Sequence, residues 1–442
     1  MNHRPPLLYA AMAAALLLSG MWFGASLWLF AAYAGMALLG GSLWLSSQWH
    51  RAAVATRRGG PSECEVGESF DVTIEITNQS RLPIAWLLVE DLFPASAYLP
   101  RPAALDIEGS RIEVMMLRAG ETKHLQYRIT CHRRGYFQIG PTVLETGDLM
   151  GLSRRYRLGT APQYVLVLPS VVPLSGYDVA SARPVGEIQI RDALMQDPTR
   201  MLGIRQWQIG DPMRSVHWPA TARTGTLHTK IYEPTTIAGA TLVLDLHRDT
   251  NPMRHEPVRS DLAITLAASI AAALHEQSQP FALLSNGRDA VDRIREDGIA
   301  TDFRTRDAAK ATASMKEQND RLRPVVLASD RGPVHYRELI RQLARLELSD
   351  GLPIAETILR AQSRLARDTT LIAILQQCPS STAAMLIGMK RRGWAVAIVI
   401  NTQDINDYIA AAGPFQAANI PVAHLADEQS LPEVTRRAAV RG

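Results

Sequence analysis

The chain has 442 residues, which predicts two to four domains, and 47% hydrophobic with 20% charged residues is typical of a globular protein. Lysine and arginine number 47 against 43 acidic residues. This small excess is spread along the chain without a basic helix or a stacked aromatic platform, which argues against nucleic-acid binding. The isolated cysteines Cys64, Cys131 and Cys378 lack CxxC spacing, which argues against a disulfide framework and a zinc site and leaves one accidental pair open. We expect reduced thiols in a cytoplasmic body.

The N-terminal segment 5–49 carries no charged residue. At about 1.5 Å per residue, one straight helix of that length would be roughly twice the ~30 Å hydrocarbon core of a bilayer. We therefore predict a helical hairpin over residues 1–50, with helices near 7–23 and 26–47 and Gly24 in the turn. Five aromatic residues lie near the predicted helix ends, where interfacial aromatics are common: Trp22, Phe23, Trp28, Trp44 and Trp49.

Positive charge indicates the orientation of this hairpin. Arg4 precedes it, Arg51, Arg57 and Arg58 follow it, and the turn carries no charge. Both ends, and the bulk of the chain, are therefore expected on the cytoplasmic side of the inner membrane as a two-pass protein. The alternative is a signal peptide that ends near residues 19–20 and precedes a single span, which would give an exported, adhesion-type binding protein.

Residues 51–62 have the polar, Gly/Pro-marked composition of a linker, and residues 63–168 have the pattern of a β-sandwich. Within 69–78, apolar residues alternate with polar ones at period two. Other strand candidates are 84–92, 111–117, 124–131, 142–148 and 164–169, separated by turn-like segments that include 133–141. Short strands at this spacing predict a sandwich.

Residues 169–238 are expected to connect the sandwich to the next domain. Residues 175–201 have the composition of an extended, partly mobile loop, and 227–234 is a strand candidate. Between them lies RQWQIGDPMRSVHWPATART (205–224), which we call the signature segment. It is the richest stretch of the chain in reactive and ion-pairing side chains.

Residues 239–442 have the pattern of a C-terminal α/β domain. Apolar runs that predict strands alternate with segments of helical spacing. The predicted strands are 240–246, 280–285, 325–329, 369–375, 394–400 and 420–425. The predicted helices are 260–277, 335–348, 353–366, 381–393, 405–413 and 431–440. This alternation predicts a parallel, doubly wound sheet.

Asp245 lies at the end of the first of these strands, where ligands of open parallel sheets bind. A magnesium site there would need further oxygen ligands, as an Asp-x-Ser-x-Ser pattern would supply. His247 and Asp249 occupy the two hydroxyl positions, and histidine is a poor magnesium ligand. Mg²⁺ is therefore conceivable at Asp245 and Asp249 only through a degraded motif, and no cofactor is expected.

The signature segment allows three interpretations. Gly210, Asp211 and Pro212 are residue types that favour a turn, and Asp211 could form an ion pair with Arg214 or Arg223. Such mixed anchors, with the large indoles of Trp207 and Trp218, suit a structural joint between two domains, or else a surface that docks a partner. The third interpretation is a hydrolase site around Asp211 and His217, but no nucleophile or paired base supports it.

The signature segment and its flanks resemble the domain-of-unknown-function family 58 (DUF58). That family reads approximately R-x-Y-x-x-G-D-x-x-R-x-I-x-W-x-x-[ST]-A-R, followed by a strand that ends in an acidic residue. The matching positions here are Arg205, Gly210, Asp211, Arg214, Trp218, Ala222, Arg223 and Glu233, with Trp207 in place of tyrosine and Val216 in place of isoleucine. Upstream, CHRRGYFQIGPTVLETGDLMGL resembles a second family element, in which Leu149 and Met150 replace Pro-Phe.

The resemblance implies a membrane-anchored protein with a C-terminal von Willebrand factor type A-like domain. Family members are commonly encoded beside MoxR-type AAA+ ATPases and a transglutaminase-like membrane protein. It therefore implies a non-enzymatic adaptor or co-chaperone of such an ATPase, acting through protein–protein recognition. The candidate interaction residues are Arg205, Trp207, Gly210, Asp211, Arg214, His217, Trp218 and Arg223.

Overall fold

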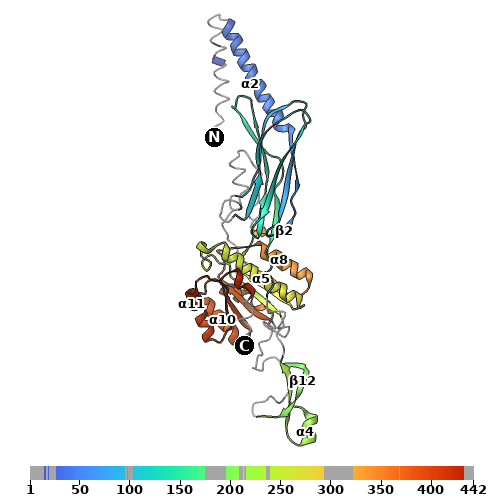
Figure 1. Cartoon of the computed structure of the whole chain (residues 1–442), viewed down its shortest axis with the longest axis vertical. Helices are drawn as coiled ribbons and strands as arrows, with labels where there is room; N and C mark the ends of the chain where they lie inside the picture. The colour runs from blue at the N-terminus through green and yellow to red at the C-terminus, as the bar shows by residue number, and fades with distance from the viewer. Residues whose placement is uncertain are drawn as a thin grey trace. The chain divides into compact units, whose positions relative to one another are not determined.

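The computed structural model describes residues 14, 15, 18, 26–94, 97, 103–174, 196–208, 213, 216–234, 239–292, 322–367 and 369–432. The chain divides into two compact units (Figure 1). Unit 1 comprises Met1–Pro169 with Asp289–Gln318, and unit 2 comprises Ser170–Arg288 with Asn319–Gly442. The predicted sandwich and the predicted α/β domain therefore fall in different units.

Unit 1 begins, within the described residues, with the long helix α2 (Ser26–Ala52). It starts at the predicted residue and continues five residues beyond the predicted end at 47. The first predicted helix, 7–23, lies largely outside the described residues. Among the residues that the structure describes, one helix passes the length and hydropathy criteria for a membrane span. It is α5 of unit 2 (Val258–Glu276), and it is mostly buried, as the core helix of an α/β layer would be.

The C-terminal half of α2 packs against the sandwich. Ser42, Ser46, Trp49 and Ala52 are buried at helical spacing, and Trp49 belongs to the sandwich core. The prediction of Trp49 as an interfacial aromatic was therefore wrong, because the helix reaches the sandwich before it ends. Trp44 is exposed, as an interfacial residue would be.

The linker predicted at 51–62 was also wrong. Residues Ala53–Gly59 form strand β1, which pairs antiparallel along its whole length with β3 (Ser69–Asn78). Its side chains do alternate between buried and accessible positions. The alternation is not visible in the sequence, because the strand consists mainly of small and charged residues. One of its inward side chains is the charged Arg57, which is ion-paired with Asp91.

Three sheets make up the sandwich of unit 1, with strand orders β1-β3-β7-β5, β10-β9-β4-β6 and β2-β11-β8. The other strands are β2 (Glu63–Glu65), β4 (Ile84–Asp91), β5 (Leu105–Gly109), β6 (Ile112–Leu117), β7 (Thr122–Cys131), β8 (Gly135–Ile139), β9 (Thr142–Gly147), β10 (Arg154–Leu158) and β11 (Gln163–Leu168). The predicted β-rich sandwich is confirmed. The turn predicted at 133–141 contains β8, which pairs antiparallel with β11.

The core of the sandwich is an apolar cluster contributed by facing strands. Ile74, Ile76, Leu87, Leu125 and Ile129 are among its fully buried members. Burial of such side chains from alternating strand positions stabilises each by about 1.5–3 kcal/mol relative to exposure. The period-two pattern read in the sequence therefore corresponds to inward-facing residues.

Unit 2 contains a six-stranded sheet with the order β17-β15-β14-β19-β20-β21. Its strands are β14 (Ala240–Leu244), β15 (Phe281–Ser285), β17 (Val325–Asp330), β19 (Thr370–Leu375), β20 (Val396–Ile400) and β21 (Val422–His424). Five of these strands run parallel, but β17 pairs antiparallel with β15. The prediction of an all-parallel sheet was therefore wrong for its edge strand, and the sheet is mixed. An antiparallel strand is tolerated at this edge because, unlike a parallel strand, it need not be buried on both faces.

The helices of unit 2 follow the predicted order. They are α5 (Val258–Glu276), α8 (Pro333–Arg345), α9 (Ile354–Ala361), α10 (Ser380–Arg391) and α11 (Ile405–Ala417), with short strands β16 (Arg288–Asp289) and β18 (Leu346–Glu347). The predicted helix 353–366 ends at Ala361 and continues as one 3-10 turn, Gln362–Arg364. Most of the helix predicted at 431–440 lies outside the described residues.

A two-stranded hairpin carries the signature segment. It pairs β12 (Gln196–Gln206) with β13 (His228–Pro234), and the short helix α4 (Trp218–Thr224) lies between them. The strand predicted at 227–234 is confirmed. The loop predicted over 175–201 was wrong for residues 196–201, which belong to β12.

Candidate functional site

The helix α4 of the signature segment is capped at both ends. The His217 side chain is its N-cap, and His217 Nδ1 accepts a hydrogen bond from the amide of Ala220 at 3.1 Å. The amide of His217 donates to the carbonyl of His228 on β13 at 2.8 Å. Gly225 ends the helix with φ +72°, a left-handed conformation that favours glycine. The local role of His217 is therefore to fix α4 onto the hairpin.

This cap bears on the hydrolase interpretation. A general base needs an unprotonated ring nitrogen directed at the substrate. Nδ1 of His217 accepts the Ala220 amide, so in the neutral ring Nε2 carries the proton and is a hydrogen-bond donor. Gly210, Asp211 and Arg214 lie outside the described residues, so the predicted turn and the pairing of Asp211 with an arginine stay predictions.

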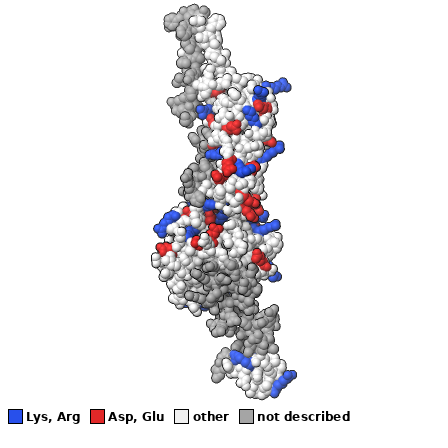
Figure 2. Space-filling view, in the orientation of Figure 1, with Lys and Arg blue, Asp and Glu red and all other residues white. Residues whose placement is uncertain are grey.

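The outward face of the signature segment is apolar and basic. Trp218 is 62% exposed, and Met213 and Leu227 are also exposed. Arg223 is exposed on the same helix, whereas Arg205 and Trp207 are half-buried. Figure 2 shows basic and no acidic side chains on the drawn face of the described hairpin. Buried Val216 and Ala220 hold α4 in place, and Trp218 projects from it as an exposed side chain.

A second candidate site lies where the strands of the unit 2 sheet end. Asp245 directly follows β14, next to the point where the strand order changes direction between β14 and β19. Ligands of open α/β sheets bind in the crevice at this position. The Asp245 carboxylate is buried and accepts hydrogen bonds from Asn286 Nδ2 at 2.8 Å, Thr250 Oγ1 at 2.8 Å and the His247 amide at 3.1 Å. Burial raises the pKa of Asp245 above its ordinary value, and these three bonds oppose that shift.

The carboxylates predicted as weak metal candidates do not converge. Asp249 lies two residues beyond His247 with its side chain exposed, and its Oδ2 is 3.8 Å from His247 Nδ1. Both oxygens of Asp245 instead accept protein donors. Within the described ranges, no group of three or more His, Cys, Asp or Glu side chains could hold a metal ion.

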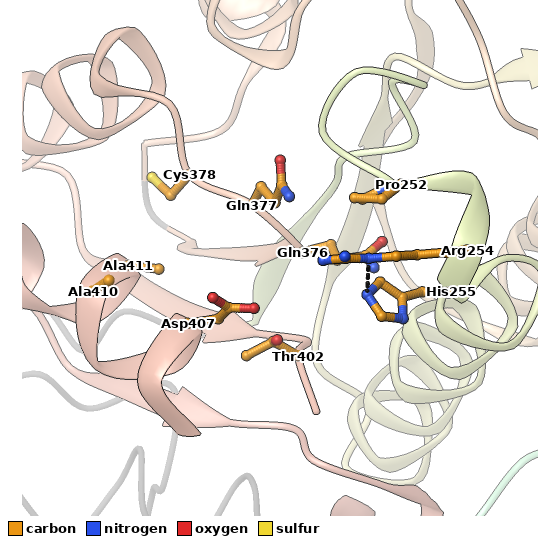
Figure 3. A pocket seen from close by; sticks show the side chains of 10 residues that line it. All are labelled: Pro252, Arg254, His255, Gln376, Gln377, Cys378, Thr402, Asp407, Ala410 and Ala411. Atoms are coloured by element: carbon orange, nitrogen blue, oxygen red, sulfur yellow. Dashed lines mark hydrogen bonds between the residues drawn. The ribbon is translucent and has the colours of Figure 1, made fainter. Parts of the chain in front are cut away.

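A cavity of about 270 Å³ opens at the same end of the sheet (Figure 3). It is lined by Pro252, Arg254, His255, Gln376, Gln377, Cys378, Thr402, Asp407, Ala410 and Ala411. In Figure 3, Arg254 and His255 lie on one side and Asp407 on the α11 side, with Gln376 between them. Oε1 of Gln376 is buried and has no hydrogen-bond partner among the described residues. The cavity therefore combines opposite charges with amides, which suits binding of a polar group.

The sequence pattern alone did not indicate these cavity residues. Gln376 and Thr402 each follow the apolar run of a strand, as Asp245 does. Their position at the carboxyl ends of parallel strands is the feature that could have indicated a site. This feature was not sufficient, because the sequence does not reveal which strands are neighbours in the sheet.

Cys378 in this cavity is expected to be unreactive near neutral pH. Burial, with a smaller contribution from Asp245, raises the pKa of its thiol to about 12. At pH 8 the thiolate fraction is then roughly a thousandfold below that of an ordinary cysteine. Alkylation by iodoacetamide, followed by mass spectrometry of the Cys378 peptide, should be correspondingly slow and should accelerate as pH rises toward 12. The urea-unfolded protein is the control, and equal rates in both states at pH 8 would contradict the prediction.

The two remaining cysteines meet inside the sandwich. The Sγ atoms of Cys64 on β2 and Cys131 on β7 are 3.5 Å apart, and both side chains are buried as free thiols. The chance cysteine pair that the sequence left open is therefore present as a contact between Cys64 and Cys131. The spacing of the cysteines in the sequence did not indicate that their two strands would meet.

The signature segment lies within a region that matches a known protein family. The architecture is a β-sandwich unit and a mixed α/β unit that carries the signature hairpin, and residues 203–301 match the family described as "Protein of unknown function DUF58". The chain is also 21% identical over 197 residues to "Uncharacterized protein YeaD" of Bacillus subtilis, which covers 44% of this chain and 48% of that protein. Both matches support the DUF58 family, and the second spans about half of the relative.

Solved structures are similar over about a quarter of this chain, with low TM-scores. A CARDB domain of the PF1109 protein from Pyrococcus furiosus is 14% identical over 26% of this chain and 91% of that chain, with a TM-score of 0.19. A FixG-related protein from Vibrio parahaemolyticus is 8% identical over 26% of this chain and 96% of that chain, with a TM-score of 0.18. Neither similarity bears on function.

Proposed function

We propose that the protein is a non-enzymatic, membrane-anchored adaptor that recognises a MoxR-type AAA+ ATPase, with a transglutaminase-like membrane protein as a second partner. The anchor is a two-pass hairpin in the inner membrane, and the bulk of the chain is cytoplasmic. The observation that carries the recognition role is the exposed Trp218 on α4, the helix that also carries exposed Arg223.

Residue types support recognition at this surface. Tryptophan and arginine dominate the energetically important positions of protein interfaces, and methionine is enriched there. Trp218 lies on a capped helix that is held by a two-stranded hairpin. An exposed tryptophan in this setting is a rigid anchor that loses little conformational entropy on binding. The short helix is fixed by His217 and by buried Val216, so the surface is preformed.

The membrane role is supported by the outer part of α2. Residues 26–49 of this helix carry no charge, and Leu27, Phe30, Tyr33 and Leu38 are exposed large apolar or aromatic residues. Figure 2 shows neither acidic nor basic side chains on the described part of α2 that extends beyond the sandwich. A helix with such a surface is stable in hydrocarbon and unfavourable in water.

We further propose that the α/β unit is von Willebrand factor A-like. The order of its strands, numbered along the chain, is 3-2-1-4-5-6 with an antiparallel third strand. Asp245 directly follows the first strand, where the acidic residue of a metal-adhesion motif would lie. Because Asp245 is already hydrogen-bonded to Asn286 and Thr250, we propose recognition without a bridging metal.

Trp218→Ala in the full-length protein is expected to weaken capture of the MoxR-type ATPase by roughly thirtyfold, the effect of losing one central interface residue. Arg223→Ala should weaken it less. Capture by the protein in nanodiscs, quantified against ATPase concentration, measures both effects.

Val334→Ala, which also truncates an exposed apolar side chain in unit 2, is the matched control and should leave capture unchanged. No enrichment of the ATPase by the unmodified protein would refute the adaptor proposal. Equal losses for Trp218→Ala and Val334→Ala would refute the hairpin as its docking surface.

A further inference from the structure

The turn between β9 and β10 presents two large apolar side chains. Leu149 is 62% exposed and Met150 is 51% exposed. The turn is tightly built, because the buried carboxylate of Asp148 accepts hydrogen bonds from the amides of Met150 and Ser153. Gly151 adopts φ +73°, and its amide donates to the Asp148 carbonyl at 3.2 Å. Leu149 and Met150 are therefore held outward by a fixed backbone.

The same turn is fixed to α2 at the level of Ser42. The Leu149 amide donates to Ser42 Oγ at 3.0 Å, and Ser42 Oγ lies 3.5 Å from Asp148 Oδ2. The residues of α2 beyond this contact, 26–41, span about 24 Å at 1.5 Å per residue. That length is less than the ~30 Å hydrocarbon core of a bilayer. A bilayer whose hydrocarbon core covers residues 26–41 of α2 therefore also reaches Ser42 and the β9–β10 turn that is bonded to it.

Two other features mark the same level as a membrane boundary. Trp44, two residues beyond Ser42, is exposed, and interfacial tryptophans are typical at headgroup depth. Directly after the turn, β10 carries three arginines, Arg154, Arg155 and Arg157. Glu145 pairs with Arg154 at 3.3 Å, which leaves a net positive strand beside the turn. Basic side chains at this depth are attracted to anionic lipid headgroups.

We propose that the β9–β10 turn inserts Leu149 and Met150 into the membrane interface, as a second contact with the lipid bilayer beside α2. This proposal rests on the proposed anchoring of α2 in the membrane. Together the two contacts constrain the orientation of the sandwich on the bilayer more than the helical anchor alone would.

Three methionines of the unmodified protein allow a direct test. Met36 lies on the apolar part of α2, Met150 lies in the turn, and Met116 on β6 is 68% exposed. Met116 precedes Leu117, whose carbonyl accepts a hydrogen bond from Asn78, the partner of Ala53 in the β1–β3 ladder. Met116 thus marks the level at which α2 ends, about 16 Å of helix farther from the membrane than Ser42.

A short pulse of hydroxyl radicals generated in water, applied to the full-length protein in nanodiscs that contain anionic lipid, should oxidise Met116 readily. Met36 and Met150 should react roughly tenfold more slowly, because side chains buried 5–10 Å into the headgroup boundary are removed from the aqueous radicals. Peptide mass spectrometry measures each rate. Leu149→Glu is expected to return the oxidation rate of Met150 toward that of Met116 and to leave Met36 protected.

The outcomes separate the two proposals. Protection of Met36 with Met150 as reactive as Met116 would overturn the turn insertion and leave the α2 anchor standing. Reactivity of all three methionines would overturn both. Protection of Met116, or protection of Met150 that survives Leu149→Glu, would show that protein or the whole sandwich face covers the turn, which also overturns the proposal.

Discussion

Replacing Arg57 with alanine is expected to destabilise the sandwich by about 3–5 kcal/mol, the cost of leaving one member of a buried ion pair without its partner. The side chains of Arg57 and Asp91 are 5% and 0% exposed. Arg57 also donates to the carbonyl of Ile139 at 2.7 Å, and Asp91 accepts further hydrogen bonds from Tyr127 and Thr142. Without Arg57, the buried carboxylate of Asp91 keeps the hydroxyl donors of Tyr127 and Thr142 but loses its ion pair.

The neighbouring Arg58 provides a matched control. It pairs with Glu75 at 3.1 Å, but its side chain is 73% exposed, so Arg58→Ala should cost less than about 1 kcal/mol. Hydrogen exchange of the β3 and β7 amides across a urea series assigns the loss to unit 1, with the β14 and β19 amides as internal reference. Equal effects of the two substitutions would show that the buried pair contributes no more than a surface pair.

Replacing Asp245 with alanine is expected to destabilise unit 2 by about 2–4 kcal/mol at neutral pH. The substitution removes the acceptor of three hydrogen bonds and takes from the buried Asn286 side-chain amide the acceptor at 2.8 Å, whereas Thr250 can still donate to the His247 carbonyl at 3.1 Å. Asp245→Asn should cost much less, because the amide keeps an acceptor oxygen and removes the buried charge. Hydrogen exchange of the β14 and β15 amides in a urea series measures both variants.

The pH dependence of the unmodified protein has a defined sign. Burial raises the folded-state pKa of Asp245 above 3.8, so between the two values the folded state binds more protons than the unfolded state. The contribution of this group to stability is therefore largest below 3.8 and decreases as pH rises through the folded pKa. Asp245→Asn should abolish that decrease, and a variant with an unchanged pH profile would contradict the assignment. Stabilisation by added Mg²⁺ would show that the ion displaces Asn286 and Thr250.

Much of the fold could be predicted because its strands have strong periodic patterns. The alternation in 69–78 and the apolar run in 240–246 mark β3 and β14 within two residues at each end. Both patterns reflect burial of side chains on one or two faces of a sheet, and burial is the property that hydrophobic periodicity measures. The same reasoning placed α5 and its successors in the right order.

The rest depends on contacts between distant residues. Arg57 on β1 faces inward because Asp91, thirty-four residues later, neutralises it, and no local pattern reveals that. The antiparallel direction of β17 is likewise set by its pairing with β15. For the candidate sites, the sequence pattern predicted Trp218, Arg223 and Asp245 as site residues. It did not indicate Gln376 or Asp407, since only the strand order brings these two to the same cavity as Arg254.

The parallel pairing of β2 with β11 has a consequence for synthesis. Cys64 on β2 lies opposite Val167 on β11, so one ladder joins residues about a hundred positions apart. Pairings of such sequence separation form slowly, because a long loop must close before any contact is gained. The ribosome releases α2 well before β11. Under the proposed membrane anchoring, α2 can therefore insert into the bilayer before the strands of the sandwich have all been synthesised.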